Sequence, residues 1–236
     1  MRIADRDARR IVTAPLTPRH WRALAGIMLT VRPRFTTLLR YLTNRGQYPC
    51  RLVLRTPLGP VSVTVWDRHD LLTINEVFFR RDYGSSPHRT VVDIGGNRGY
   101  ATLFFLTRDA DTRVWIFEPD PENVEKLRRT LSGFTGRYHL VEKAVTPDEV
   151  AAVRFVPNGR YGRIAREGET GIEVAAISIA SVIRDVAAEA GEIDLVKIDT
   201  EGTEPELVAA LARGAPVREV RYEDIGRIVA FRPAET

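Results

Sequence analysis

Two acidic residues stand where predicted strands end and the chain turns. Asp93 ends one apolar run and is followed by a turn that holds Gly95 and Gly99, and Glu118 ends a second apolar run 25 residues later (118 − 93). The carboxyl ends of parallel strands form the crevice in which open α/β sheets bind ligands. At these positions, Glu118 can accept hydrogen bonds from both hydroxyls of a ribose, and Asp93 can contact an ammonium group. We therefore expect a nucleoside-type ligand.

The spacing of the glycines separates two classes of nucleoside ligand. Dinucleotide folds use G-x-G-x-x-G, which brings the backbone close to a pyrophosphate. Here the residue two positions after Gly95 is Asn97, and the charge of Asp93 would repel a pyrophosphate. The D-x-G-x-x-x-G spacing suits S-adenosylmethionine, which has a ribose and an ammonium group but no phosphate. The sequence favours this methyl donor over NAD.

A second group of charged residues follows a strand predicted over 193–199. Lys197 and Asp199 lie on one side of that strand, and Glu201 and Glu204 follow in the turn and the helix start. A positioned carboxylate can take the proton of a hydroxyl acceptor, which speeds a transfer by about 10² to 10⁴. Asp199 is our candidate base, with Lys197 or Glu201 orienting the acceptor. An alternative that we leave open, but favour less, is that Asp199 and Glu201 hold Mg²⁺.

An α/β pattern from residue 90 onward positions these residues. The predicted strands are 90–94, 113–118, 138–144, 193–199 and 219–223. The predicted helices are about 99–108, 121–131, 181–190 and 204–213. Alternating runs at 153–156 and 172–177 predict a small antiparallel excursion. Strands that alternate with helices are typical of a parallel sheet with right-handed crossovers.

Two helices and a hairpin are predicted before this sheet. Apolar spacing indicates helices over about 18–31 and 34–45, whose apolar faces we expect to cover a core or a partner subunit. The runs 52–56 and 61–66 predict a hairpin, and Asp70 is the expected cap of a further helix.

Charge is unevenly placed along the chain. Residues 1–58 carry 12 Arg against Asp5 and Asp7, a net of +10 (12 − 2), and the remainder carries −6 (23 − 29). We interpret residues 1–48 as a basic helical region and 49–236 as the ligand-binding domain, within a single globular unit. The basic region indicates a solvated face or an acidic partner: nucleic acid, a carrier protein, a phosphorylated substrate or a second subunit.

Length and composition exclude several classes of protein. The 236 residues suit one α/β domain with an extra element, and the single cysteine, Cys50, excludes an intrachain disulfide. The apolar run 23–31 is shorter than the roughly 20 residues of a membrane span, and the charged start does not resemble a secretory signal. We expect a cytoplasmic protein with no membrane partner. Among the histidines, His88 is the one we expect nearest the crevice.

Three segments of the sequence resemble the FkbM-type S-adenosylmethionine-dependent methyltransferases. They are 92–100, 117–123 and 195–204, and Glu76–Phe78 with Tyr83 is a weaker match. The resemblance covers about residues 70–223. It implies a class I methyltransferase fold, in which a Rossmann-like sheet carries helices on both faces.

The same resemblance implies a cofactor site. The residues implied around the methionine part of S-adenosylmethionine are Asp93, Gly95, Asn97 and Gly99. It places Glu118 on the ribose, Glu142 and Ala144 near the adenine, and Tyr83 among the cofactor-binding residues. Two departures stand out: Gly96 replaces a common Ala, which we expect to be harmless, and only 13 residues follow Glu223. The last strands should therefore be shortened to about 227–231 or be absent.

The leading hypothesis is an O-methyltransferase that acts on a hydroxyl of a small molecule, such as a sugar, a polyketide or a peptide. N-methylation or a nucleic-acid substrate is the alternative, supported only by the basic region; nucleic acid is less favoured because that region lacks interleaved base-stacking aromatics. A non-catalytic scaffold that keeps the fold is a third hypothesis. The identity of the acceptor, the metal dependence and the oligomeric state stay open. One open arrangement is a homo-oligomer formed through the N-terminal helices.

Overall fold

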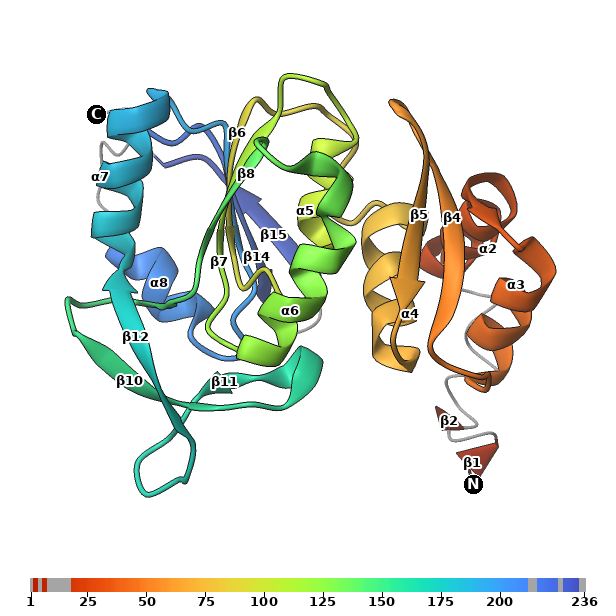
Figure 1. Cartoon of the computed structure of the whole chain (residues 1–236), viewed down its shortest axis with the longest axis horizontal. Helices are drawn as coiled ribbons and strands as arrows, with labels where there is room; N and C mark the ends of the chain where they lie inside the picture. The colour runs from red at the N-terminus through yellow and green to blue at the C-terminus, as the bar shows by residue number, and fades with distance from the viewer. Residues whose placement is uncertain (1, 4–5, 8–17, 212–215, 225–226, 234–236) are drawn as a thin grey trace. The chain divides into compact units, whose positions relative to one another are not determined.

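The apolar runs from residue 90 onward form a six-stranded sheet that is parallel except for one edge strand (Figure 1). In spatial order its strands are β15 (Arg227–Phe231), β14 (Val220–Asp224), β13 (Leu195–Ile198), β6 (Thr90–Ile94), β7 (Arg113–Phe117) and β8 (Tyr138–Val141). Nearly every residue of β6, β7 and β13 is buried. Strands buried on both faces have unbroken apolar sequences, which is why the sequence locates them well.

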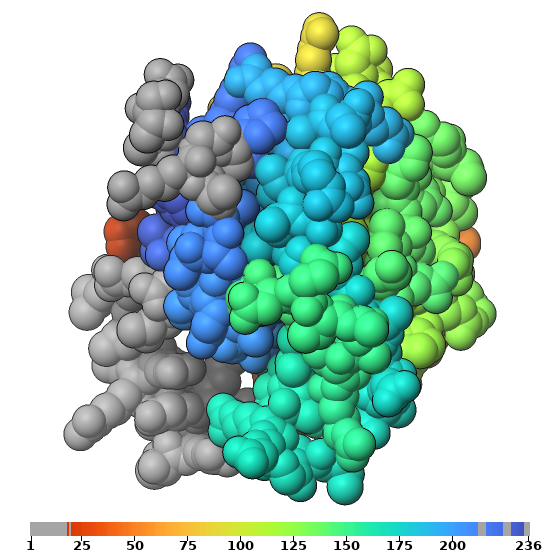
Figure 2. Space-filling view, turned by 90° about the vertical axis from the view of Figure 1, so that its left-hand side faces the viewer, coloured from red at the N-terminus to blue at the C-terminus, as the bar shows by residue number. Residues whose placement is uncertain are grey.

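Helices cover both faces of this sheet (Figure 1). On one face lie α5 (Tyr100–Leu106) and α6 (Pro121–Thr130), and on the other lie α7 (Ile179–Ala190) and α8 (Glu204–Ala210). Figure 2 shows the outer surface of α7 and α8, in cyan to blue. Local caps start two of these helices, because Asp120 accepts a hydrogen bond from Glu122 N and Ser178 accepts one from Ser181 N. The expected Rossmann-like sheet with helices on both faces is confirmed.

The structure is a computed structural model and describes residues 2–3, 6–7, 18–211, 216–224 and 227–233. Contacts divide the chain into two units, residues 1–85 and residues 86–236. Elements of the first unit are β1 (Arg2–Ile3), β2 (Arg6–Asp7), α2 (Pro18–Thr30), β3 (Val31–Arg32), α3 (Arg34–Thr43), β4 (Cys50–Thr56), β5 (Gly59–Val65), α4 (Arg68–Ile74) and the π-helix η2 (Asn75–Phe79). The hairpin and α4 therefore group with the N-terminal helices. This division differs from the expected boundary after residue 48.

The predicted strand 138–144 is divided between two sheets. After β8 the N–H of Lys143 donates to the carbonyl of Val141 at 3.0 Å, which turns the backbone out of the main sheet. The second sheet has the order β11 (Arg163–Ile164), β10 (Ala152–Val156), β12 (Ile172–Ser178) and β9 (Ala144–Thr146). Strands β10 and β12 pair antiparallel, so the predicted excursion is confirmed.

The far edge of the main sheet ends in a single antiparallel strand. Strand β15 pairs with β14 in a register that places Val220 opposite Phe231. This is the shortened end that the sequence predicts. Helix α8 ends at Ala210, and residues 212–213 at its predicted end lie outside the described residues.

Two local details of the first unit differ from the sequence-based expectation. The helix cap is Asp67, which accepts hydrogen bonds from the N–H groups of His69 and Asp70, while the Asp70 carboxylate accepts one from Trp66 N at 2.6 Å. Both acids are thus used in a reciprocal arrangement at the helix start. The hairpin turn is shorter than predicted because Thr56 already pairs with Gly59. Pro60 is tolerated inside β5 because β5 is an edge strand.

Gly96 is more constrained than the sequence suggests. A Cβ on this residue would lie 2.2 Å from Cγ2 of Ile116, so the side chain of Ile116 fills the space that an alanine methyl would need. The departure from the common Ala is therefore compensated in the core.

We predict that Gly96→Ala lowers the free energy of unfolding by about 1–3 kcal/mol because it overpacks the core. Urea unfolding measures the change. The double variant Gly96→Ala/Ile116→Leu removes the colliding Cγ2 and should recover part of the loss. Gly133→Ala is the matched control, because a Cβ there meets nothing within 4 Å. Equal stability of the two glycine variants would contradict the prediction.

Candidate functional site

The turn after β6 packs directly against the turn after β13. Gly95 has φ +78°, and a Cβ on it would lie 1.9 Å from the carbonyl oxygen of Asp199. Only glycine allows this approach and this backbone conformation together. Asn97 also has a left-handed backbone, with φ +48°, and Gly99 precedes α5 with φ +84°. The glycine turn of the sequence is therefore a tight bend at the carboxyl edge of the sheet.

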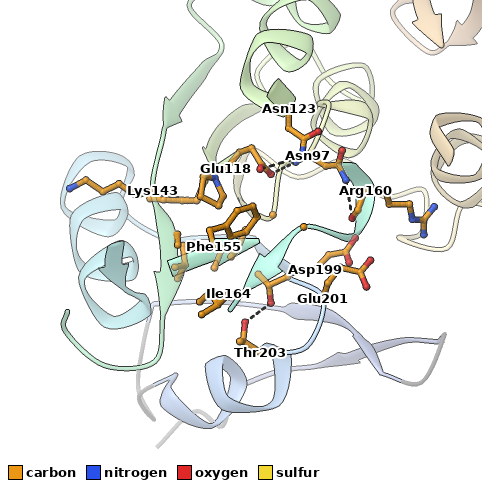
Figure 3. Close-up of a pocket in the computed structure, with 18 of the residues that line it drawn as sticks. Asn97, Glu118, Asn123, Lys143, Phe155, Arg160, Ile164, Asp199, Glu201 and Thr203 are labelled. Carbon is orange, nitrogen blue, oxygen red and sulfur yellow. Dashed lines mark hydrogen bonds between the residues drawn. The ribbon is translucent and has the colours of Figure 1, made fainter. Parts of the chain in front are cut away.

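A pocket lies over this bend (Figure 3). It holds about 500 Å³ of space, counting its open mouth. Its walls come from the ends of β6, β7 and β13, from the chain after β8, and from β10, β11 and the 3-10 helix η4 (Gly159–Tyr161). The crevice predicted at the carboxyl ends of the strands is thus present.

Glu118 lies on one side of the pocket, and only 4% of its surface is exposed. Its carboxylate accepts hydrogen bonds from Asn97 N at 2.7 Å and from Asp120 N at 3.0 Å. Burial raises the pKa of Glu118 to about 7, and these hydrogen bonds oppose the rise. Oε1 also accepts from Asn123 Nδ2 at 3.5 Å, whereas Oε2 keeps a further lone pair with which Glu118 can accept from a ligand hydroxyl.

Asp93 does not line the pocket. It is fully buried, with its Oδ1 2.9 Å from the ammonium of Lys197 and its Oδ2 accepting a hydrogen bond from Thr102 Oγ1 at 2.6 Å. The pairing of β6 with β13 sets Asp93 opposite Lys197. The predicted contact of Asp93 with a ligand ammonium is therefore replaced by a contact with a protein ammonium.

Lys197 is also buried, and it does not line the pocket. Its ammonium donates to the carbonyl of Gly95 at 2.7 Å and lies 3.6 Å from Asp199 Oδ2. Burial alone would lower the pKa of Lys197, but the charges of Asp93 and Asp199 outweigh burial and raise it. The predicted role of Lys197 in orienting an acceptor is corrected: it is a charged positioning residue below the pocket.

Two carboxylates lie across the pocket from Glu118. Figure 3 shows Asp199 and Glu201 together on that side. Glu201 is half-buried and has φ +58°, a conformation that costs free energy in a residue other than glycine. Burial and the charge of Asp199 raise the pKa of Glu201 to about 7, whereas Arg160 lowers it. The site therefore holds an acidic side chain that can exchange a proton near neutral pH.

The neighbouring acid Glu204 has a structural role. It accepts hydrogen bonds from Thr200 N at 2.7 Å and from Gly202 N at 2.8 Å. These bonds hold the turn that carries Glu201. No group of three or more His, Cys, Asp or Glu suited to a metal occurs among the residues that the structure describes.

The remaining predicted residues divide between the pocket and other places. Ala144 lines the pocket, but Glu142 is exposed and pairs with Arg128 because the chain turns after β8. Tyr83 is buried in the first unit and is not among the lining residues. His88 precedes β6 at its amino end, away from the pocket, where its carbonyl accepts from Thr112 Oγ1. The expectation that His88 lies near the crevice is wrong.

Sequence reasoning missed the wall that the excursion contributes. Phe155, Arg160 and Ile164 line the pocket from β10, η4 and β11. Asn97 Nδ2 donates to the carbonyl of Arg160 at 3.4 Å, and Asn123 Nδ2 donates to that of Gly159 at 3.2 Å. These bonds tie η4 to the glycine turn and to α6. The only available signal was that both asparagines follow strand ends within the two motifs.

We predict that Lys197→Met lowers the free energy of unfolding by about 3–5 kcal/mol, because it leaves the charge of Asp93 buried and unpaired. The double variant Asp93→Asn/Lys197→Met should be more stable than Lys197→Met, since no unpaired charge remains. Urea unfolding of both variants tests the coupling. Arg184→Met, which removes an exposed cation paired with Asp185, is the control and should change stability by less than about 0.5 kcal/mol. Additive losses in the double variant would contradict the role of the pair.

Comparisons with solved structures found partial similarities to several methyltransferases. Among solved structures, the methyltransferase FkbM from Methylobacillus flagellatus KT matches 93% of this chain and 50% of its own, at 14% identity and a TM-score of 0.44. A putative caffeoyl-CoA O-methyltransferase from Staphylococcus aureus matches 68% of this chain and 59% of its own, at 12% identity and a TM-score of 0.37. A putative RNA methyltransferase from Pyrococcus horikoshii matches 65% and 59%, at 12% identity and a TM-score of 0.36.

The chain spans between half and three-fifths of the length of these structures. No curated protein matches it. The model of the methyltransferase FkbM domain matches residues 93–231, which is 139 of the 236 residues (231 − 93 + 1). Because that match includes both turns of the pocket and the excursion between them, the chain belongs to the family of FkbM methyltransferases.

Proposed function

We propose that the chain transfers a methyl group from S-adenosylmethionine to a hydroxyl group of a small molecule. The observation that carries the proposal is the arrangement of three carboxylates in one pocket, with Glu118 on one side and Asp199 and Glu201 on the other. Membership of the FkbM methyltransferase family supports the reaction class.

The residues of the pocket fit this cofactor. S-adenosylmethionine carries positive charge at its sulfonium and ammonium groups, and the carboxylates of Glu118, Asp199 and Glu201 outnumber the lining cations Lys143 and Arg160. Glu118 is the group that would hold the ribose hydroxyls. Asp93 is paired with Lys197, so Asp199, whose backbone carbonyl meets the glycine turn at Gly95, carries the carboxylate that would face the ammonium. The residue two positions after Gly95 is Asn97 and not the second glycine of a dinucleotide site, which supports the preference over NAD.

Bound in this pocket, S-adenosylmethionine supplies an electrophilic methyl carbon. Glu201 takes the proton from the acceptor hydroxyl, because a base with a pKa near the working pH is the most effective. This choice replaces Asp199, the base favoured from the sequence, since Asp199 lies 3.6 Å from the ammonium of Lys197 and is held beside it. The bonds from Asn97 and Asn123 to η4 hold the pocket wall in place, and such fixed positioning is worth up to about 7–11 kcal/mol in a well-aligned transfer.

The base also favours a hydroxyl acceptor over an amine. A neutral amine already has a lone pair for the methyl group, whereas a hydroxyl must lose its proton. Glu201 meets that need. Mg²⁺ held by Asp199 and Glu201 is the less favoured arrangement, because only these two of the lining carboxylates lie together.

We predict that S-adenosylmethionine and S-adenosylhomocysteine raise the unfolding temperature of the chain and that NAD does not. A ligand at about 100 times its dissociation constant stabilises by about 2.7 kcal/mol, or on the order of 5–10 °C for a chain of this size. Glu118→Ala should lose the shift, because it removes the ribose acceptor. Glu142→Ala is the matched control and should keep the shift, since Glu142 is exposed outside the pocket.

The same proteins test the transfer with methyl-labelled S-adenosylmethionine and a panel of monosaccharides, small hydroxylated compounds and amines. Label in a hydroxyl compound, lost in Glu201→Gln, is the expected result. Label in an amine or in added RNA would overturn the choice of acceptor. A shift with NAD alone would overturn the cofactor, and binding without transfer to any compound would favour a scaffold.

A pH dependence follows from the raised pKa of Glu201. The folded chain holds a proton on Glu201 at pH values between about 4.5 and 7, where the unfolded chain has released it. Stability relative to the Glu201→Gln variant should therefore decrease as the pH rises from 5 to 8. Thermal unfolding of the two proteins across this range measures the difference. A difference that stays constant with pH would contradict the assignment.

A further inference from the structure

The first unit contains a long stretch without acidic residues. Between Asp7 and Asp67, residues 8–66 include ten Arg and no Asp or Glu. The two helices and most of the hairpin of the first unit lie in this stretch. Methyl transfer in the pocket of the second unit makes no use of it.

The outer side of α3 is apolar. Phe35, Leu39 and Leu42 are exposed by 75%, 61% and 47%, and their spacing of four and three residues places them on one side of the helix. We expected this side to cover a core or a partner subunit, and in the described part of the chain these three side chains stay largely exposed. Exposed apolar side chains gathered in this way usually mark an interaction site.

A shallow depression of about 840 Å³, counting its open side, adjoins these side chains. It is lined by Arg32, Pro33, Arg34, Phe35, Arg51 and Val53. None of its three arginines forms an ion pair with a described residue. Phe35 belongs both to the depression and to the apolar side of α3, so the two are continuous. We refer to Arg32, Arg34, Arg51, Phe35, Leu39 and Leu42 together as the basic apolar face.

We propose that the basic apolar face binds the surface of a lipid bilayer that contains anionic phospholipids. Guanidinium groups match phosphate oxygens in geometry and charge. Phe35, Leu39 and Leu42 can enter the boundary between headgroups and acyl chains, as the apolar side of an interfacial helix does. Each arginine near such a surface strengthens binding by about fivefold.

Charge and side-chain type favour this partner over others. A second copy of the chain would bring one arginine cluster against another. Nucleic acid would match the charge, but Phe35 is the one ring of the face on which a base could stack, and the two leucines offer none. No helix in the described residues is long and apolar enough to cross a membrane, and binding at a surface does not need one. The proposal revises the expectation of no membrane partner, which rested on the lack of a spanning segment.

Sedimentation of the full chain with vesicles tests the proposal. We expect binding to vesicles of phosphatidylglycerol and phosphatidylcholine, little binding to pure phosphatidylcholine, and weaker binding at high salt. Phe35→Ser/Leu39→Ser and Arg32→Gln/Arg34→Gln should each reduce binding at least about tenfold. The controls are Val150→Ser/Ile172→Ser and Arg113→Gln/Arg154→Gln, which change exposed residues of the second unit and should bind as the wild type does.

Several outcomes would overturn the proposal. They are equal binding to the two kinds of vesicle, equal losses in variants and controls, or a dimer in analytical ultracentrifugation that the face variants abolish without any vesicle binding. Stronger binding to RNA than to vesicles would assign the face to nucleic acid. The S-adenosylhomocysteine shift reports folding of the second unit and is independent of the vesicle result, so either proposal can fail alone.

Discussion

The buried ion pair between Asp93 and Lys197 holds together the two turns on which the pocket is built. The ammonium of Lys197 lies 2.9 Å from Asp93 and donates to the carbonyl of Gly95 at 2.7 Å, and Asp199 is 3.6 Å away on the other side. A single buried cation thus connects the glycine turn, its preceding strand and the acidic turn. Because removing one partner would leave an uncompensated charge in the core, Asp93 and Lys197 are fixed for positioning and are unavailable for direct chemistry.

The pocket above this pair holds glutamates in two different environments. Burial raises the pKa of both Glu118 and Glu201 to about 7. Glu118 accepts hydrogen bonds from two backbone N–H groups, which orient it as an acceptor toward the pocket. Glu201 accepts no such bond among the described contacts. Its pKa is set instead by burial and by the charges of Asp199 and Arg160. The first environment suits the recognition of hydroxyls, and the second suits the exchange of a proton.

The two units of the chain differ in charge as well as in fold. The pocket of residues 86–236 is rich in carboxylates, whereas residues 8–66 have only basic charged side chains. An acidic pocket attracts a cationic cofactor, and a basic apolar face attracts an anionic surface. On the two proposals made above, one short chain would combine a reaction with attachment to a surface, each carried by its own unit.

Local sequence determined the elements and the presence of a ligand crevice, since buried parallel strands leave unbroken apolar runs and since Asp120 caps the helix that directly follows it. The roles of the acids were decided only by the tertiary structure. Asp93 and Lys197 are 104 residues apart (197 − 93), and the pairing of β6 with β13 brings them together. Three other features also depend on segments that are distant in the sequence. They are the approach of η4 to Asn97, the contact that keeps residue 96 a glycine, and the lack of a covering segment in the described part of the chain, which leaves Phe35 exposed. Periodicity and spacing report only on neighbours along the chain, so they could not distinguish a carboxylate that faces a ligand from one that is paired with a buried lysine.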